Sequence, residues 1–234
     1  MLTPYRLRPG DTGPVQRTPT TCGAACLTVA RMTLDAVFAS WVRTGHPHPP
    51  GTPAGTSMEE RFAAYERVVL HRTNGLRLSG GHLNAPWPHR LGTAPWGARR
   101  ELERGASRVG TDYEIAVLRS GDGEALGTDF DRLVAVVTDG APALLYVGDG
   151  RLPRHVTLVL PGAGSGSLAV YDPADGAVDH LRRDAFTERR LRLSGWDAPW
   201  FLVQPTGTTA VRSSGLTAWA RALARPPRAS APTT

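Results

Sequence analysis

The pattern of apolar residues changes near Gly140, and this change constrains the fold of the chain more than any other feature. Before it, apolar residues recur at helical spacing in segments that we expect to be helices at 22–42, 58–72, 96–105 and 129–138. After it, short runs rich in Val, Leu, Tyr and Phe predict strands at 143–147, 155–160, 168–171 and 200–203. Helices followed by consecutive strands favour an α+β fold with an antiparallel sheet.

The first predicted helix, from Cys22 to about Val42, is apolar on more than one face, which is typical of a buried helix. Thr20 and Thr21 are candidate N-caps, so Cys22 lies in the first helical turn. The second helix follows two overlapping capping boxes in the segment 56–60. The glycine-rich loop 162–167 predicts a hairpin between the second and third strands.

We expect one domain over residues 1–205 and a basic, disordered tail over 206–234. A chain of 234 residues is long enough to bury a core without disulfides or metal. All 27 basic residues are Arg, a usage that resembles high-GC bacterial genomes. From Pro205 onward there are four Arg and no acidic residues, so this end carries +4 of the formal net charge of +6. The remaining body is nearly neutral, and we expect no nucleic-acid partner.

The sequence also predicts a protein without membrane span, metal or cofactor. No run of about 18 apolar residues is present, and the first residues lack the apolar core of a secretory signal. The two cysteines, Cys22 and Cys26, do not make a disulfide framework or half of a zinc ribbon. We therefore expect a cytoplasmic protein with reduced thiols, in which Cys26 is a small core residue.

Four residues have the side chains that nucleophilic catalysis requires: Gln16, Cys22, His155 and Asp172. A cysteine in the first turn of a helix lies where the helix dipole and free N–H groups favour the thiolate. A histidine that opens a strand can exchange a proton with that thiol, and a carboxylate in the following turn can orient the imidazole. Gln16 can donate its amide to an oxyanion beside the Cys22 backbone N–H.

The local sequences around these residues resemble those of the C39-like peptidases in the papain-like superfamily, of a standalone actinobacterial type. The stretch QRTPTTCGAACL, from Gln16 to Leu27, is similar to the cysteine box of that family. The stretches RHVTLV and YDPADG, at 154–159 and 171–176, resemble its histidine box and Asp-Pro turn. The resemblance implies a papain-like fold, with a helical lobe around the nucleophile helix packed on a sheet lobe.

The resemblance also implies roles and a substrate class. Cys22 matches the nucleophile, His155 the base, Asp172 the orienting acid and Gln16 the oxyanion donor. Gly23 matches a small residue that lets the substrate approach, which leads us to expect cleavage after Gly. The substrate would be a peptide or protein, and Trp96 is a candidate substrate contact. The position before the cysteine, often acidic in that family, is Thr21 here.

Two other functions remain open at this point. With an amine in place of water as the acceptor, the same four residues would make an acyltransferase. A papain-like fold without turnover would be a binding module, although a pure binder has no need of all four residues.

Overall fold

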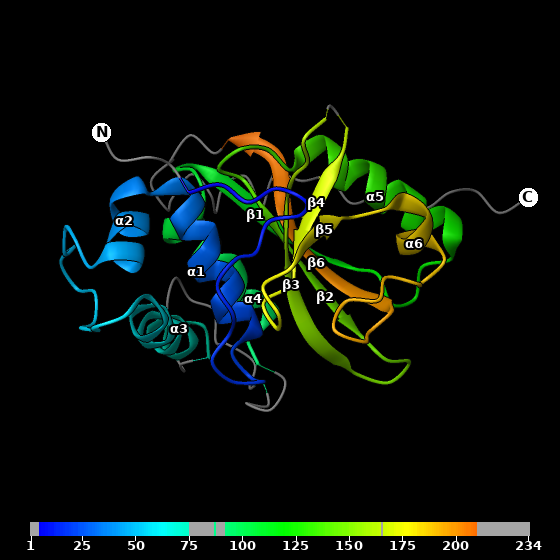
Figure 1. Cartoon of the computed structure of the whole chain (residues 1–234). Helices are drawn as coiled ribbons and strands as arrows, with labels where there is room; N and C mark the ends of the chain where they lie inside the picture. The colour runs from blue at the N-terminus through cyan, green and yellow to red at the C-terminus, as the bar shows by residue number, and fades with distance from the viewer. Residues whose placement is uncertain (1–4, 75–86, 88–91, 165, 210–234) are drawn as a thin grey trace, which may run out of the picture.

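A six-stranded antiparallel sheet separates two groups of helices (Figure 1). The computed structural model describes residues 5–74, 87, 92–164 and 166–209. The strand order is β1-β6-β2-β3-β4-β5, with the strands at Thr111–Val117 (β1), Ala143–Gly148 (β2), Pro153–Pro161 (β3), Leu168–Tyr171 (β4), Val178–His180 (β5) and Ala198–Thr209 (β6). The expected α+β class with an antiparallel sheet is confirmed.

The central strands are buried on both faces. In β2, Leu144 and Tyr146 belong to one core cluster, whereas Leu145 and Val147 belong to the other. This alternation follows from the pleat, which sends successive side chains to opposite faces. It explains why these strands are almost continuously apolar in sequence.

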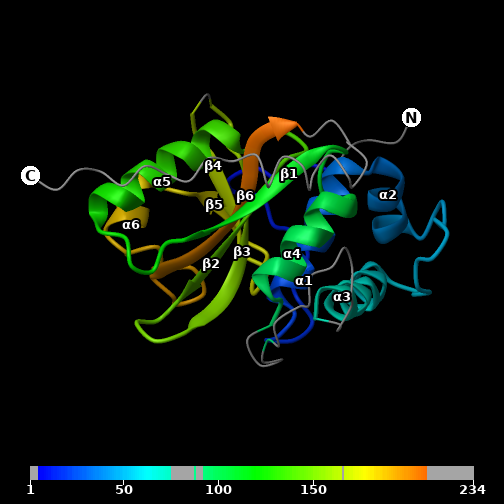
Figure 2. The same cartoon turned by 180° about the vertical axis from the view of Figure 1, so that it is seen from behind.

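Helices near the N-terminus cover the first face, and two later helices cover the second (Figure 2). The first group comprises α1 (Cys22–Leu34), α2 (Ala36–Thr44), α3 (Met58–Asn74), α4 (Pro95–Glu101) and a short π-helix, η2 (Leu102–Ala106). The second group comprises α5 (Gly123–Val136) and α6 (Arg183–Thr187). The candidate nucleophile helix therefore packs directly on the sheet.

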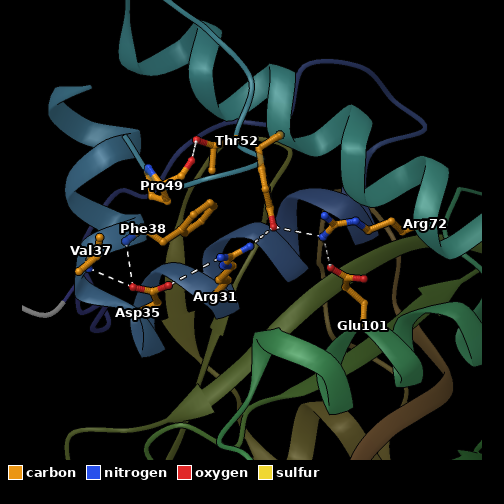
Figure 3. A network of polar contacts seen from close by, with 9 residues as sticks. Arg31, Asp35, Val37, Phe38, Pro49, Thr52, Arg72 and Glu101 are labelled. Atoms are coloured by element: carbon orange, nitrogen blue, oxygen red, sulfur yellow. Dashed lines mark hydrogen bonds and ion pairs between the residues drawn. The ribbon is translucent and has the colours of Figure 1, made fainter. Parts of the chain in front are cut away.

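The prediction of one helix from Cys22 to Val42 is wrong. The chain leaves helical geometry at Asp35, whose backbone is extended, and α1 and α2 meet at 117°. The Asp35 carboxylate accepts the N–H groups of Val37 and Phe38, both at 3.0 Å, and so caps α2 (Figure 3). Asx capping of this kind begins a new helix without a glycine or proline break, which is why the apolar pattern alone suggested continuity.

The other predicted elements are confirmed with shifted ends. The helix expected at 58–72 is α3, the one at 96–105 is α4 continued by η2, and the one at 129–138 is α5, which begins earlier at Gly123. All four predicted strands are present, and β3 and β4 form the expected hairpin with Pro161 opposite Leu168. The sequence analysis missed β1, β5 and α6. Because β1 and β5 are the sheet edges, their residues mix polar and apolar types and give a weak strand signal.

The end of the domain also differs from the expectation. Strand β6 runs to Thr209, past the predicted boundary at residue 205. The rest of the predicted tail, 210–234, lies outside the described residues. Among those that are described, no single helix is long and apolar enough to span a membrane, although the bent pair α1 and α2 together has the length and composition.

Helix α4 approaches α3 so closely that residue 97 must be glycine. A side-chain carbon at Gly97 would lie 2.1 Å from the backbone oxygen of Thr73. At the same end, Arg72 of α3 pairs with Glu101 of α4 at 3.2 Å (Figure 3). The chain segment that enters α4 is therefore held against the end of α3.

We expect Gly97→Ala to lower the free energy of unfolding by about 1–3 kcal/mol, because α4 must move away from α3. Gly105→Ala is the matched control, since an added carbon there meets no atom within 4 Å. The control should leave stability unchanged or raise it by up to about 1 kcal/mol. Denaturant unfolding measures both, and equal values for the two variants would contradict the packing argument.

Candidate active site

Cys22 is the first residue of α1, as the sequence analysis predicted, and its side chain is buried with 2% of the residue exposed. Thr21 occupies the N-cap position but makes no side-chain cap bond; its hydroxyl donates to the Thr18 carbonyl at 2.9 Å instead. No acidic residue lies in the first turn of α1. The helix dipole therefore acts on the thiol without a competing carboxylate in that turn.

His155 lies near the start of β3 and is 5% exposed. Its Nε2 is 2.6 Å from Oδ1 of Asp172, within the range expected for an orienting hydrogen bond. Burial alone would lower the pKa of His155, but its interactions with Asp172 and with the Cys22 thiol outweigh this effect and raise the pKa to about 9. The structure thus brings Cys22, His155 and Asp172 together, and it favours an imidazolium at neutral pH.

Asp172 follows β4 and is held by three donors. Besides the imidazole, its carboxylate accepts the Ala174 N–H at 3.0 Å and the Ser194 hydroxyl at 2.8 Å. Burial raises the pKa of Asp172, yet the contact with His155 and these hydrogen bonds prevail and lower it. The carboxylate therefore stays ionised opposite the imidazolium.

Ser194 is a site residue that the sequence analysis missed. It has φ of 47° and, with Gly195 at 81°, occupies a tight turn in which Leu193 and Trp196 exchange both backbone hydrogen bonds. Positive φ at two central residues is typical of a type I′ hairpin turn. A Ser-Gly pair signals such a turn, but nothing in the sequence indicates that its hydroxyl reaches a carboxylate 22 residues earlier.

Gln16 lies beside the Asp172 turn. Its backbone N–H donates to the Pro173 carbonyl at 2.7 Å, which ties it to the residue after the orienting acid. Its side-chain Oε1 is buried and has no hydrogen-bond partner among the described residues. The backbone of Gln16 is therefore fixed, whereas the oxygen of its side-chain amide makes no hydrogen bond with the described residues.

Gly23 is buried, and a side-chain carbon there would lie 2.6 Å from Cβ of Thr93. The small residue therefore has a packing reason: it makes room for Thr93. The predicted role of Gly23 in substrate approach stays a prediction.

The segment 92–94 forms a wall against the first turn of α1. A side-chain carbon at Gly92, which has φ of 70°, would lie 3.6 Å from Cys22 Sγ. Asn74 holds the segment by donating to the Gly92 carbonyl at 3.0 Å and accepting the Ala94 N–H at 3.2 Å. The Tyr146 hydroxyl donates to the Thr93 carbonyl at 3.0 Å. These clamps join residues far apart in sequence, and no local pattern points to them.

Two further sequence predictions concern residues near this wall. Trp96 lies in α4, and its ring packs edge-on against Trp87 with the ring centroids 5.3 Å apart, so its role as a substrate contact stays a prediction. Cys26 is fully buried, and its thiol donates to the Val156 carbonyl at 3.4 Å. The interpretation of Cys26 as a core residue is confirmed.

Two cavities lie away from this site. A cavity of about 590 Å³ lies beside Leu160 and residues 161–164 and 166–167, at the end of β3 away from His155. A second, of about 420 Å³, lies between α5 and β5. In the described ranges, no group of three or more His, Cys, Asp or Glu side chains is placed to hold a metal ion.

Similar solved structures include the two below, whereas no family model and no curated protein matches the chain. One is the peptidase domain of Streptococcus ComA, described as a bi-functional ABC transporter involved in a quorum sensing pathway; it is 14% identical, covers 83% of this chain and 98% of its own, and has a TM-score of 0.37. The other is the Pseudomonas avirulence protein AvrPphB, which is 12% identical, covers 84% of this chain and 97% of its own, and has a TM-score of 0.43. Neither likeness assigns an activity, so the role of each residue rests on this chain's own contacts.

We expect the His155 imidazole to lose its proton near pH 9 in the wild type and at lower pH in Asp172→Asn, because a neutral amide no longer stabilises the imidazolium charge. Histidine NMR signals followed against pH measure this midpoint. Asp179→Asn removes the same charge from an exposed position on β5 and should leave the midpoint unchanged. A midpoint unaffected by Asp172→Asn would contradict the pairing of His155 with Asp172.

Proposed function

We propose that this chain is a papain-like cysteine peptidase that resembles the C39-like type and hydrolyses peptide bonds. One observation carries the proposal: the buried His155–Asp172 pair at 2.6 Å lies against the thiol of the first residue of α1. A merely structural imidazole needs neither a thiol beside it nor an ionised carboxylate that is itself held by two further donors. A nucleophile, its base and an orienting group in hydrogen-bond reach are the pattern of covalent catalysis.

In the first half of the reaction, the Cys22 thiolate attacks the carbonyl carbon of the scissile peptide bond, and a C–S bond forms. The negative charge moves to the carbonyl oxygen, where the Cys22 backbone N–H and the Gln16 amide would donate to it. The tetrahedral adduct then collapses and the C–N bond breaks, while the His155 imidazolium gives its proton to the leaving amine. The product of this step is a thioester on Cys22 with neutral His155.

In the second half, neutral His155 takes a proton from water, and the oxygen of that water attacks the thioester carbon. The C–S bond breaks, the carboxylic acid leaves, and the thiolate and imidazolium are restored. Asp172 keeps the imidazole oriented throughout, because its carboxylate stays bonded to Nε2 while the other ring nitrogen exchanges the proton.

The space around the thiol favours a small residue before the scissile bond. Cys22 is 2% exposed, and the segment 92–94 lies against it, with the position of a side-chain carbon on Gly92 in van der Waals contact with Sγ at 3.6 Å. Thr93 fills the space over Gly23. A substrate residue that reaches the thiol past these groups has little room for a side chain, which supports the expectation of cleavage after Gly.

We expect iodoacetamide at a pH of about 6.5 to label Cys22 well before Cys26, because only Cys22 has the helix start and the imidazole that favour a thiolate. His155→Ala should slow the labelling of Cys22. Mass spectrometry of the digested protein locates the label, and Cys26→Ser is the control that should leave the rate at Cys22 unchanged. Equal labelling of both thiols, insensitive to His155→Ala, would refute an activated nucleophile.

We expect a peptide library treated with the wild type to be cut after Gly, and Cys22→Ala to abolish the cuts, because the acyl intermediate requires the sulfur. Mass spectrometry of the products identifies the cleaved bonds. Cuts that depend on Cys22 but follow bulky residues would contradict the predicted cleavage after Gly, while they would still support Cys22 as the nucleophile. Transfer to an added amine in place of hydrolysis would instead identify an acyltransferase.

A further inference from the structure

Glu66 is a fully buried carboxyl group, in the middle of α3, that the mechanism above does not use. Its two carboxylate oxygens accept the backbone N–H of Arg17 at 3.2 and 3.4 Å. The Thr21 hydroxyl is a second polar group close enough to act on the carboxyl and to lower its pKa. A single side chain from α3 therefore reaches the connection that leads into α1.

The two groups that Glu66 contacts lie next to two residues of the proposed mechanism. Arg17 follows Gln16 directly, and Thr21 directly precedes Cys22. Since the Gln16 N–H is bonded to the Pro173 carbonyl, Gln16 is anchored on one side to the Asp172 turn and on the other to Glu66. The buried Oε1 of Gln16 has no partner among the described residues, so the hydrogen bonds that hold Gln16 there are those of its own N–H and of the Arg17 N–H.

The carboxyl group at position 66 costs stability when it is ionised. Burial raises the pKa of Glu66, the contacts with Arg17, Thr21 and Arg67 offset only part of that effect, and the pKa is about 7. This value lies above the ordinary 4.5, so the group favours the folded state below pH 4.5, and that contribution is lost as the pH rises through about 7. A glutamine would accept the same Arg17 N–H without this cost, which indicates that the charge has another use.

The charged and titratable groups that face Glu66 come from each neighbouring element. Arg17 precedes α1, Arg67 belongs to α3, Cys26 to α1 and Tyr171 to β4. The two Arg residues favour the ionised carboxyl, whereas Cys26 and Tyr171 remain neutral because burial raises the pKa of each well above its usual value.

We propose that Glu66 is a positioning residue whose ionised carboxylate holds the Arg17 N–H and thereby directs the Gln16 amide toward the oxyanion. Its negative charge makes the bond to the N–H stronger than a neutral acceptor would. The inference rests on the proposed peptidase function where it is tested by catalysis. A second test, by NMR, depends only on the anchoring of Gln16.

Glu66→Gln tests the proposal in peptide hydrolysis, with the exposed Glu59→Gln of the same helix as the matched control. Loss of an oxyanion donor lowers kcat by about 10²–10³-fold, so a displaced donor should lower kcat by about tenfold, with KM little changed. Alkylation of Cys22 by iodoacetamide needs no oxyanion donor and should stay at the wild-type rate. In a Gln16→Ala background, Glu66→Gln should cause no further loss, because its effect passes through Gln16.

Stability separates this role from a structural one. Glu66→Gln should be as stable as the wild type or more stable at a pH of about 8, because it removes an ionised buried carboxyl. A loss of kcat together with lower stability and slower alkylation would assign Glu66 to the fold alone. A full kcat loss that persists in the Gln16→Ala background would also overturn the proposal.

A readout without substrate keeps the test decisive if no peptide is cut. The chain has two glutamines, and the Gln204 amide, bonded to Glu114 at 3.0 Å, is an internal reference. With ¹⁵N-labelled glutamine, the side-chain signal of Gln16 should shift with a midpoint near pH 7 in the wild type and lose that transition in Glu66→Gln. A Gln16 signal that ignores pH in this range would reject the anchoring, whereas hydrolysis absent from the wild type would reject only the peptidase function.

Discussion

The close packing of α1 on β3 is the contact on which the rest of the site depends. The first turns of α1 consist of small residues that are all buried, 22–26, and small side chains allow a helix to approach a sheet closely. The Cys26 thiol reaches the backbone carbonyl of Val156, the residue after His155. This contact fixes the start of the helix beside the imidazole, so the thiol and the histidine meet although 133 positions separate them in the chain.

Electrostatics then distinguishes two buried carboxyl groups of the same region. Asp172 is bonded to a histidine, a hydroxyl and an N–H, and its pKa is lowered, whereas Glu66 is bonded to weaker partners and its pKa is raised to about 7. Opposite shifts of this kind are how one fold separates the roles of like groups. Here the carboxylate with the lowered pKa is bonded to the imidazole, and the one with the raised pKa lies behind the chain that bears the proposed oxyanion donor.

Local physics accounts for the elements that the sequence predicted correctly. The central strands could be predicted because they are short, nearly continuous apolar runs, and α3 could be predicted because its apolar residues recur at helical spacing. The break at Asp35 could not be predicted, because an aspartate that caps α2 leaves the apolar pattern of both helices intact. The edge strands β1 and β5 were missed because they are partly exposed, so polar residues interrupt their apolar pattern.

The amino-acid sequence by itself determined the fold class, the helix-start position of Cys22 and the candidate quartet with His155, Asp172 and Gln16, because each depends on local pattern or on short motifs. Only the tertiary structure decided which groups support that quartet. Ser194 bonds to Asp172, Asn74 holds the segment beside Cys22, and Glu66 holds the residue after Gln16. Thr93 is the packing partner of Gly23. Such contacts follow from how helices and strands pack, and no short-range pattern encodes a partner that lies tens of residues away.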